Sequence, residues 1–297
     1  MKHLVDIESL SDTGIQEIFE LAGTVRQGGA ARARGPVATL FYEPSTRTEM
    51  SFLRACQIAG AEVLRLTPET SSATKGEGPV ETVKTLFAIG ARTVVIRTSE
   101  PLLPERLTEV GPSIVNAGDG AHAHPTQALA DAATLMDAIG PDLSGLTVVM
   151  AGDHLHSRVS RSSATLLTRL GCRVVLVGPP SLNPPELARA LGAQAAASLD
   201  EALATADVVM ALRIQRERQG AGLVPDAAEY RRVWGVTEER FRAHPHLLLM
   251  HPGPANLGVE VDPAVVDDER SLIRRQVAMG PYIRAAVLAL VGKGPDA

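Results

Sequence analysis

The chain has 297 residues and a formal net charge of −5, and 45% of its residues are hydrophobic and 21% charged. This length allows two domains of ordinary size, and the composition excludes a disordered chain. The negative charge argues against nucleic acid as a partner, and no apolar run reaches the ~18 residues of a membrane span. The N-terminus lacks the apolar core of an export signal, which predicts a cytoplasmic protein. Cys56 and Cys172 stand apart, without metal-ligand spacing, and are interpreted as core residues.

Apolar segments alternate with helical patterns through the first half of the chain. Continuous apolar runs separated by helices are typical of a buried parallel sheet. A long helical stretch after His124 leads to "GPDLSG" (140–145), which is expected to be a hinge between domains. The predicted strands are 37–42, 61–66, 93–98 and 113–118, and the predicted helices lie near 11–27, 46–59, 79–90 and 101–110.

The second half repeats this alternation and ends in an amphipathic helix at about 274–292. Strands are predicted at 146–152, 172–178, 207–212 and 246–251, with helices near 157–170, 184–192, 199–205 and 226–243. The pattern predicts an α/β fold of two doubly wound parallel-sheet domains with helices on both faces. The C-terminal helix is expected to return to the first domain, which then comprises 1–132 and 280–297, whereas the second comprises 133–279.

Polar side chains follow most of the predicted strands. Because the carboxyl ends of parallel strands share one edge of a sheet, where ligands bind, these residues are candidates for a site. In chain order they are Ser45, Thr46, Arg47, Thr48, Ser71, Ser72, Lys75, Arg97, His124, Gln127, Arg158, Arg213, Gln215, Gly253 and Pro254.

The stretch "PSTRT" (44–48) permits two interpretations. Ser45 or Thr46 can cap the following helix, and Thr46 with Glu49 fits the spacing of a capping box. Alternatively, backbone N–H groups at the helix start, hydroxyls and the Arg47 guanidinium form a phosphate site. Since a helix cap needs no arginine, Arg47 favours the anion site.

Other candidates also have plain structural alternatives. Lys75 alone is typical of a solvated loop, Arg158 and Arg213 could form salt bridges, and "HPGP" (251–254) could be only a rigid turn. Arg97 ends an apolar strand, which suggests an anionic partner. His124 and Gln127 lie one helical turn apart, so they can project two hydrogen-bonding groups from one helix end.

Familiar cofactor motifs are missing from the sequence. The segment "AGDHLHSR" (151–158) lacks the glycine spacing of a dinucleotide loop, and no phosphate-loop lysine pattern occurs. No cluster has the spacing of zinc ligands. Neither a nucleotide cofactor nor a metal is therefore expected.

The motifs together resemble one family. "PSTRT", "NAGDG", "HPTQ", "GDHLHSRV", "RIQRER" and "HPGPANLGVE" occur in the order found in the aspartate/ornithine carbamoyltransferases, closest to the aspartate-specific catalytic chains, from about residue 3 to 291. The resemblance implies transfer of the carbamoyl group of carbamoyl phosphate to L-aspartate, giving N-carbamoyl-L-aspartate and phosphate. That reaction belongs to de novo pyrimidine biosynthesis.

The resemblance also implies residue roles. Carbamoyl phosphate would contact Ser45, Thr46, Arg47, Thr48, Arg97, His124, Gln127 and the backbone at Gly253 and Pro254. Lys75, Arg158, Arg213 and Gln215 would bind aspartate, and the catalytic residues would be Arg47, Thr48, His124 and Lys75. Family members are homotrimers with shared active sites, so Ser71 or Ser72 and Lys75 would come from the neighbouring subunit. A regulatory chain or a dihydroorotase partner is left open.

The residue types agree with this chemistry. An uncharged amine attacks the carbamoyl carbon, and donors such as His124, Arg47 and Thr48 stabilise the charge that develops on oxygen. No covalent nucleophile is required. Two arginines, Arg158 and Arg213, favour a dicarboxylic acceptor over a cationic one, because arginine binds carboxylates bidentately.

Four positions depart from the family's usual residues: Glu49, Thr98, Leu257 and Met279. In addition, the usual serine and leucine after Lys75-Gly76-Glu77 are replaced by Gly78 and Pro79. Glu49 in particular lowers the positive potential near the phosphate site. Two alternatives therefore stay open: a carbamoyltransferase for another amino acceptor, and a catalytically weak structural or regulatory trimer.

Overall fold

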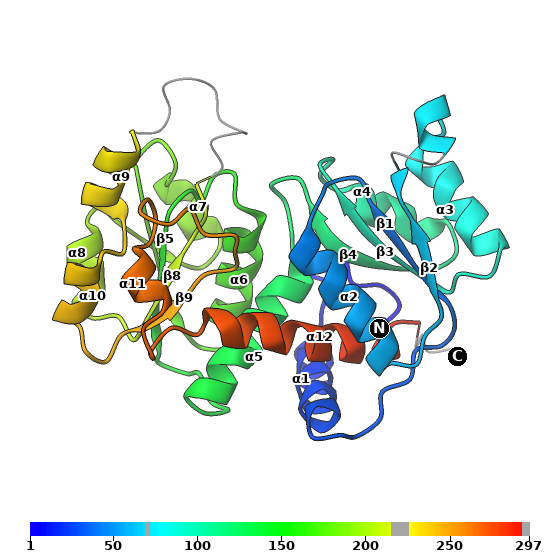
Figure 1. Cartoon of the computed structure of the whole chain (residues 1–297), viewed down its shortest axis with the longest axis horizontal. Coiled ribbons are helices and arrows are strands. Elements are labelled where there is room, and N and C mark those ends of the chain that lie inside the picture. The colour runs from blue at the N-terminus through cyan, green and yellow to red at the C-terminus, as the bar shows by residue number, and fades with distance from the viewer. Residues whose placement is uncertain (69–71, 215–225, 293–297) are drawn as a thin grey trace. The chain divides into compact units, whose positions relative to one another are not determined.

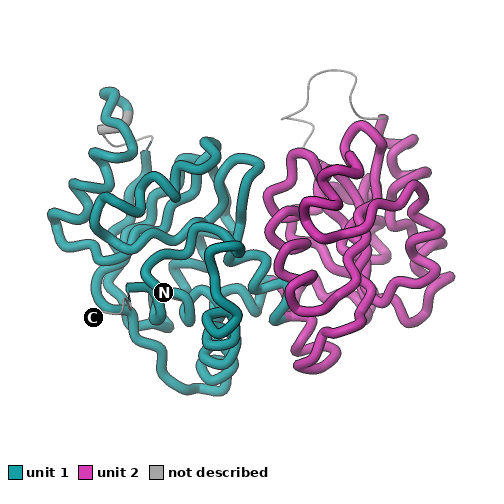
Figure 2. Tube along the Cα trace, turned by 180° about the vertical axis from the view of Figure 1, so that it is seen from behind, with its two compact units in different colours: residues 1–133, 277–297 teal, residues 134–276 magenta. Residues whose placement is uncertain are grey.

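The computed structural model describes residues 1–68, 72–214 and 226–292 (Figure 1). The chain forms two compact units, one of residues 1–133 with the chain from Val277 onward, the other of residues 134–276 (Figure 2). Each unit contains one parallel β-sheet and packs helices against it. The predicted α/β class with two parallel-sheet domains is confirmed.

The first unit has a sheet in the order β2-β1-β3-β4, and every pairing is parallel. Its strands are β1 (Val37–Phe41), β2 (Val63–Leu66), β3 (Thr93–Thr98) and β4 (Ser113–Asp119). Its helices are α1 (Asp12–Arg26), α2 (Thr46–Ile58), η2 (Ser72–Lys75), α3 (Pro79–Ala88), α4 (Leu103–Arg106) and η3 (Leu107–Glu109), and α5 (Pro125–Ala138) continues into the second unit.

The winding of this sheet reverses at its centre. The chain leaves β1 towards β2 but leaves β3 towards β4, so right-handed crossovers place α2 on one face and both α3 and α4 on the other. In agreement, Leu86 of α3 and Leu103 of α4 share a core cluster with Leu40 of β1 and Ile96 of β3. The carboxyl ends of β1 and β3 therefore form a topological switch point, which is where ligands bind in doubly wound sheets.

The second unit repeats this plan with the order β7-β6-β5-β8-β9, again entirely parallel. Its strands are β5 (Thr147–Ala151), β6 (Arg173–Val177), β7 (Gln194–Ala196), β8 (Val208–Ala211) and β9 (Leu248–Met250). Its helices are α6 (Arg158–Arg169), α7 (Pro185–Ala190), α8 (Leu199–Leu203), α9 (Ala227–Trp234), α10 (Glu238–Ala243) and α11 (Pro263–Val266), and α12 (Ile273–Leu290) continues into the first unit.

The switch point of the second sheet lies between β5 and β8. One core cluster joins Leu203 of α8, Tyr230 of α9 and Phe241 of α10 to Val149 of β5 and Val209 of β8. These three helices therefore cover one face, and the crossover rule places α6 and α7 on the other. Loops after β5 and β8 consequently diverge from adjacent strand ends, as they do after β1 and β3.

Two details of the secondary structure differ from expectation. The single helix predicted at 226–243 is two helices, because the backbone turns to an extended conformation at Gly235. A Cβ there would lie 2.7 Å from the carbonyl oxygens of Arg231 and Val259, so only glycine permits this close approach. The edge strand β7 was not predicted, because it spans three residues that are mostly exposed and give no apolar run.

The C-terminal helix α12 returns to the first unit, as predicted. Ala289 packs in a cluster with Val25 and Ala31, and Arg34 donates a hydrogen bond to the carbonyl oxygen of Gly292 at 2.7 Å. Residues 293–297 of the expected C-terminal segment lie outside the described residues. No helix among the described residues is long and apolar enough to cross a membrane.

Candidate active site

The start of α2 presents the "STRT" residues at the carboxyl end of β1. Ser45 precedes the helix with φ −161° and ψ 89°, and its side chain makes no capping hydrogen bond. Thr46 and Arg47 are exposed, whereas Thr48 is buried. The interpretation of Ser45 as a side-chain cap is therefore wrong. The first N–H groups of α2 need another acceptor, which an anion can supply.

Glu49 does not complete a capping box either. The helix begins at Thr46, so Glu49 lies at its fourth position, and its carboxylate accepts a hydrogen bond from Arg65 Nε at 2.8 Å. A second Arg65 nitrogen lies 2.7 Å from the same oxygen. Arg65 belongs to β2 and is about half exposed, so this pair neutralises Glu49 at the surface beside the predicted phosphate site.

Arg97 lies next to β1, because Phe41 and Arg97 are partners in the parallel register of β1 and β3. Its Nη1 donates to the carbonyl oxygen of Ala117 at 3.1 Å, and its Nε lies 3.7 Å from a carboxylate oxygen of Glu43. The side chain is only 13% exposed. The strand ends therefore hold a largely buried cation a few residues from the start of α2, at the switch point.

His124 precedes α5 and is buried. Gln127, in the first turn of α5, is half-buried, and its Nε2 donates to a carboxylate oxygen of Asp131 at 2.8 Å. The carbonyl oxygen of His124 accepts hydrogen bonds from the N–H groups of Gln127 and Ala128. His124 and Gln127 therefore both lie at the start of α5.

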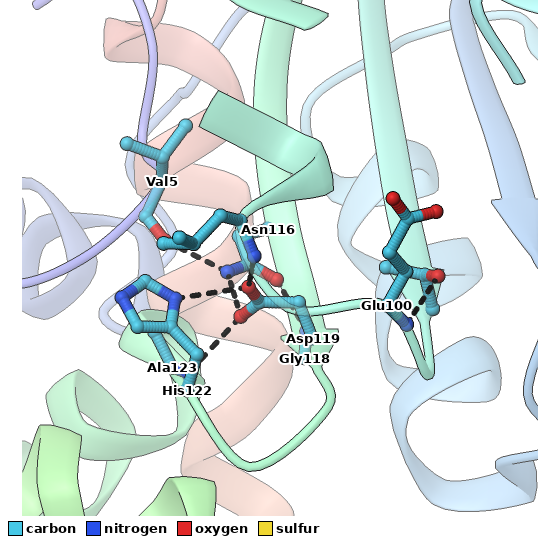
Figure 3. A network of polar contacts seen from close by, with 9 residues as sticks. Val5, Glu100, Asn116, Gly118, Asp119, His122 and Ala123 are labelled. Carbon is cyan, nitrogen blue, oxygen red and sulfur yellow. Dashed lines mark hydrogen bonds and ion pairs between the residues drawn. The ribbon is translucent and has the colours of Figure 1, made fainter. Parts of the chain in front are cut away.

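A buried carboxylate holds the loop before His124. Asp119 accepts hydrogen bonds from Asn116 Nδ2 at 2.7 Å and from the Ala123 N–H at 3.0 Å, and His122 Nδ1 lies 2.9 Å from its second oxygen (Figure 3). The same oxygen accepts from the N–H of Leu102, which has φ +64°. Asp119 thus ties the turn 119–123 to the loop after β3, although sequence reasoning gave it no role.

Lys75 is the last residue of η2 and is exposed. Ser72 is the first residue of η2, whereas Ser71 and Gln215 lie outside the described residues. Arg47 follows β1, Arg97 lies near the end of β3, and His124 and Gln127 follow β4. Lys75 lies in the connection between β2 of the same sheet and α3.

In the second unit, Arg158 is the first residue of α6 and is buried, with Ser157 capping the helix through the N–H of Ser160. The loop before it is organised by His154. The Nε2–H of His154 donates to the carbonyl oxygen of Val177 at 3.1 Å, and its Nδ1 lies 2.7 Å from the Ser160 hydroxyl. Complete burial lowers the pKa of His154 to about 4, so the imidazole is neutral near pH 7.

Arg213 follows β8 and is half-buried. The ends of β5 and β8 approach closely there, because a Cβ on Gly152 would lie 2.9 Å from Leu212 Cβ, and Gly152 has φ +147°. The loop that carries Arg158 and the segment that carries Arg213 therefore start from neighbouring points at the switch of the second sheet. The pairing of β5 with β8 thus brings these two chain segments to adjacent strand ends.

The "HPGP" loop after β9 is held by a buried pair. His251 Nε2 lies 3.3 Å from a carboxylate oxygen of Glu260, and both residues are almost fully buried. His251 Nδ1 accepts a hydrogen bond from the Gly253 N–H at 2.8 Å, and the same Glu260 oxygen accepts from the Asn256 N–H. The loop with Gly253 and Pro254 is thus more than a turn, because buried side chains fix its backbone.

Three residues that depart from the family pattern differ in how far they are buried. Thr98 is buried and its hydroxyl accepts from the Glu100 N–H at 3.0 Å, whereas Leu257 is 55% exposed and Met279 is buried on α12. In the described part of the chain, no group of three or more His, Cys, Asp or Glu is arranged to hold a metal ion.

Two family models match the chain, one in each half of the sequence. Residues 2–137 match the aspartate/ornithine carbamoyltransferase family's carbamoyl-P binding domain, and residues 144–291 match its Asp/Orn binding domain. The chain belongs to the aspartate/ornithine carbamoyltransferase family. The resemblance inferred from the motifs is confirmed.

Among its relatives, the aspartate carbamoyltransferase catalytic subunit of Salinispora arenicola is 48% identical, covering 93% of this chain and 90% of the relative. That of Gluconacetobacter diazotrophicus is 44% identical, covering 99% and 94%. The aspartate transcarbamoylase of Trypanosoma cruzi, solved with carbamoyl phosphate and aspartate, superposes with a TM-score of 0.87 at 29% identity, covering 98% of this chain and 96% of the other. The catalytic subunit from M. jannaschii gives 0.83 at 30% identity, covering 97% of each.

Proposed function

We propose that this chain transfers the carbamoyl group of carbamoyl phosphate to the amino group of L-aspartate. The proposal rests on the start of α2, where the first helical N–H groups and Arg47 follow β1, whose Phe41 is paired in register with Arg97 of β3 at the switch point of the first sheet. The relatives named above are aspartate carbamoyltransferases, and one was solved with both substrates.

The phosphate of carbamoyl phosphate would bind Ser45, Thr46, Arg47 and Thr48 together with Arg97. Charge-assisted hydrogen bonds from arginine to phosphate are stronger than neutral ones, and the N-terminus of α2 adds its own positive potential. The Glu49–Arg65 pair sits at the side of this site and reduces the local effect of the carboxylate. The phosphate site therefore tolerates Glu49.

His124 and Gln127 would bind the carbonyl oxygen and the amide of the carbamoyl group. The Gly253 N–H is already donated to His251, so the backbone groups that this loop offers a ligand are its carbonyl oxygens, which suit an amide donor. The Pro254 backbone, which follows in the same loop, has no N–H either. These contacts together would orient the carbamoyl group.

In the reaction, the lone pair of the aspartate amine forms a C–N bond to the carbamoyl carbon. The C–O bond to phosphate breaks, phosphate leaves with that electron pair, and the proton that the amine loses passes to the leaving phosphate. Negative charge develops on the carbonyl oxygen and the leaving phosphate, where His124, Thr48 and Arg47 would stabilise it. Bringing the two substrates together supplies at most about 7–11 kcal/mol more.

Aspartate would bind through Arg158 and Arg213, with Gln215 assisting. Arg158 is buried at the start of α6, and Arg213 follows the adjacent strand end, so the two guanidinium groups suit a dicarboxylate better than the cationic side chain of ornithine. Lys75 would act on aspartate as well, from the neighbouring subunit.

The proposed assembly is a homotrimer in the cytoplasm, acting in pyrimidine biosynthesis. Val80 and Phe87 of α3, and Ile89 directly after it, are 40%, 36% and 64% exposed, which is typical of a surface that a second subunit covers. Lys75, Ser71 and Ser72 precede this helix, so contact through α3 would bring the same segment to a neighbouring subunit.

The decisive experiment measures N-carbamoyl-L-aspartate formed by the purified chain from carbamoyl phosphate and L-aspartate. An Arg47→Ala variant should lose this activity. If a folded wild-type chain gives no product with aspartate but carbamoylates another amine, the acceptor is different. If it carbamoylates no amine, the chain is a structural or regulatory trimer.

A mixing experiment tests the shared site. Lys75→Ala and Arg47→Ala variants, each inactive, are dissociated and reassembled together. Shared sites predict that activity reappears, because some sites in the mixed trimers then contain neither defect. If activity stays absent although mixed trimers form, Lys75 acts within its own subunit.

A further inference from the structure

A buried arginine lies behind the predicted carbamoyl phosphate residues of the first unit. Arg284 of α12 is 3% exposed, and its Nη1 donates to the Ser51 hydroxyl of α2 at 2.8 Å. Its guanidinium carbon lies 5.2 Å from the centre of the Phe52 ring. Gly280, one turn earlier in α12, makes room for it, because a Cβ there would overlap Arg284 Nη1.

The Arg284 side chain retains its positive charge near neutral pH. Burial lowers the pKa of Arg284 to about 10, and the carboxylate of Asp131 on α5 acts in the opposite direction. Asp131 is itself fully buried. A buried charge is costly unless an opposite charge is near, and the field of the Asp131 carboxylate favours the charged form of Arg284.

Asp131 also orients Gln127. Gln127 Nε2 donates to Asp131 Oδ1 at 2.8 Å. A side-chain amide has a donor end and an acceptor end, and an ionised carboxylate can only accept. Asp131 therefore holds the NH₂ end of Gln127, and the carbonyl oxygen is the end that remains for a ligand.

We propose that Asp131 and Arg284 are positioning residues that make this site select the carbamoyl group. Asp131 fixes Gln127 so that its carbonyl oxygen accepts a hydrogen bond from the carbamoyl NH₂, and Arg284 supplies the charge that keeps Asp131 in place. Acetyl phosphate carries a methyl group where carbamoyl phosphate carries NH₂, so it gains nothing from this orientation. The inference rests on the proposed function, because it assumes that Gln127 contacts the carbamoyl group.

The test is calorimetric binding of carbamoyl phosphate, acetyl phosphate and inorganic phosphate, each without aspartate. The wild-type chain should prefer carbamoyl phosphate to acetyl phosphate. In Asp131→Asn this preference should fall by about tenfold, the worth of one hydrogen bond, because asparagine can hold the Gln127 amide in either orientation. The affinity for inorganic phosphate should change by less than about twofold, because phosphate does not contact Gln127.

Arg284 variants separate charge from packing. Arg284→Gln should lower the preference for carbamoyl phosphate by about tenfold, whereas Arg284→Lys keeps the charge and should restore most of it. Arg34→Gln is the matched control, since Arg34 also bonds the chain near the end of α12, through the carbonyl oxygen of Gly292. That variant should leave the preference unchanged.

Equal weakening of all three ligands in Asp131→Asn would mean that the pair serves packing alone, and it would overturn the proposal, as would an unchanged preference. If Arg284→Gln does not fold, the comparison of Asp131→Asn with Arg284→Lys decides. Failure of the proposed function is a separate result: it shows as no N-carbamoyl-L-aspartate from the wild-type chain, whereas the ligand preference is measured without aspartate.

Discussion

The two units share one winding plan but hold their candidate site residues by different means. In the first unit, Thr46 and Arg47 are exposed at the start of α2, and the helix itself supplies N–H groups. In the second, Arg158 is buried, and its loop is held by the fully buried His154. A phosphate site built on a helix start needs little support, whereas an arginine site that depends on side chains needs a buried polar scaffold.

This difference predicts separable effects of substitution. Changes at Thr46 and Arg47 should alter the reaction and leave stability nearly unchanged, because these two side chains are exposed. Changes in the scaffold of the second unit should alter stability first, because they leave buried polar groups without partners.

Arg47→Ala should lower kcat/KM for carbamoylation of aspartate by about 10²–10³-fold, the usual effect of removing one donor to transition-state charge. The midpoint of urea unfolding should move little. Arg54→Ala is the control, because Arg54 is an exposed arginine of the same helix that bonds only Gln57 among the described residues. A large loss of stability in Arg47→Ala would contradict the claim that the start of α2 affects the reaction and not the stability.

His154→Gln should lower the free energy of unfolding by about 2–3 kcal/mol at pH 7, because the Ser160 hydroxyl and the Val177 carbonyl lose a well-placed partner. Urea unfolding measures it. The control is His246→Gln, an exposed histidine whose Nε2 bonds the carbonyl oxygen of Ala206. Equal destabilisation by both variants would contradict a special role for His154.

The same histidine predicts a pH dependence. The pKa of His154 is lowered from 6.5 to about 4 in the folded state, so between these values the unfolded chain binds more protons. Its contribution is complete above pH 6.5 and is lost as the pH falls, by about 3 kcal/mol in total at pH 4. Unfolding from pH 7 to pH 4.5 should therefore show a smaller slope in His154→Gln than in the wild-type chain. Parallel curves would refute this.

Arg158→Gln should raise KM for aspartate by about 10–100-fold, because charged hydrogen bonds contribute about 1.5–3 kcal/mol. The affinity for carbamoyl phosphate should stay within about twofold. Arg169→Gln, at the exposed end of the same helix, is the matched control. If Arg158→Gln weakens both substrates equally, its role is not specific to the acceptor.

Glu49→Gln should lower the dissociation constant of carbamoyl phosphate by about 2–5-fold at low salt, because it removes a negative charge near the phosphate site and releases Arg65. The effect should fade at high salt, since the pair is exposed. Glu62→Gln, at an exposed residue next to β2, serves as the control. Weaker binding in Glu49→Gln would indicate that the pair with Arg65 supports the site.

Much of the fold could be predicted because its signals are local. The apolar runs at 93–98 and 113–118 became β3 and β4 with ends that match to within one residue. The start of α2 at Thr46 was expected from the change of pattern there. The expected helix at 226–243 failed because its break at Gly235 depends on a carbonyl of Val259, distant in sequence.

The candidate site was predictable in part for the same reason. Side chains that follow a strand are local in sequence, so Arg47, Arg97 and Arg158 could be recognised from their positions alone. Asp119 and Glu260 were missed because their partners, the N–H groups of Leu102 and Asn256 among them, are set by how loops fold back. The sequence signal that could have found Asp119 is its place directly after the predicted strand at 113–118.

Hydrophobic periodicity and turn chemistry act over a few residues, so the sequence alone predicts the alternation of strands and helices and the polar residues that end each strand. The packing of the folded chain sets which strand ends are neighbours, which carboxylates are buried, and the hydrogen bond of Arg284 on α12 to Ser51 of α2. Such contacts join residues far apart in the chain. They depend on helix packing, which no local pattern encodes.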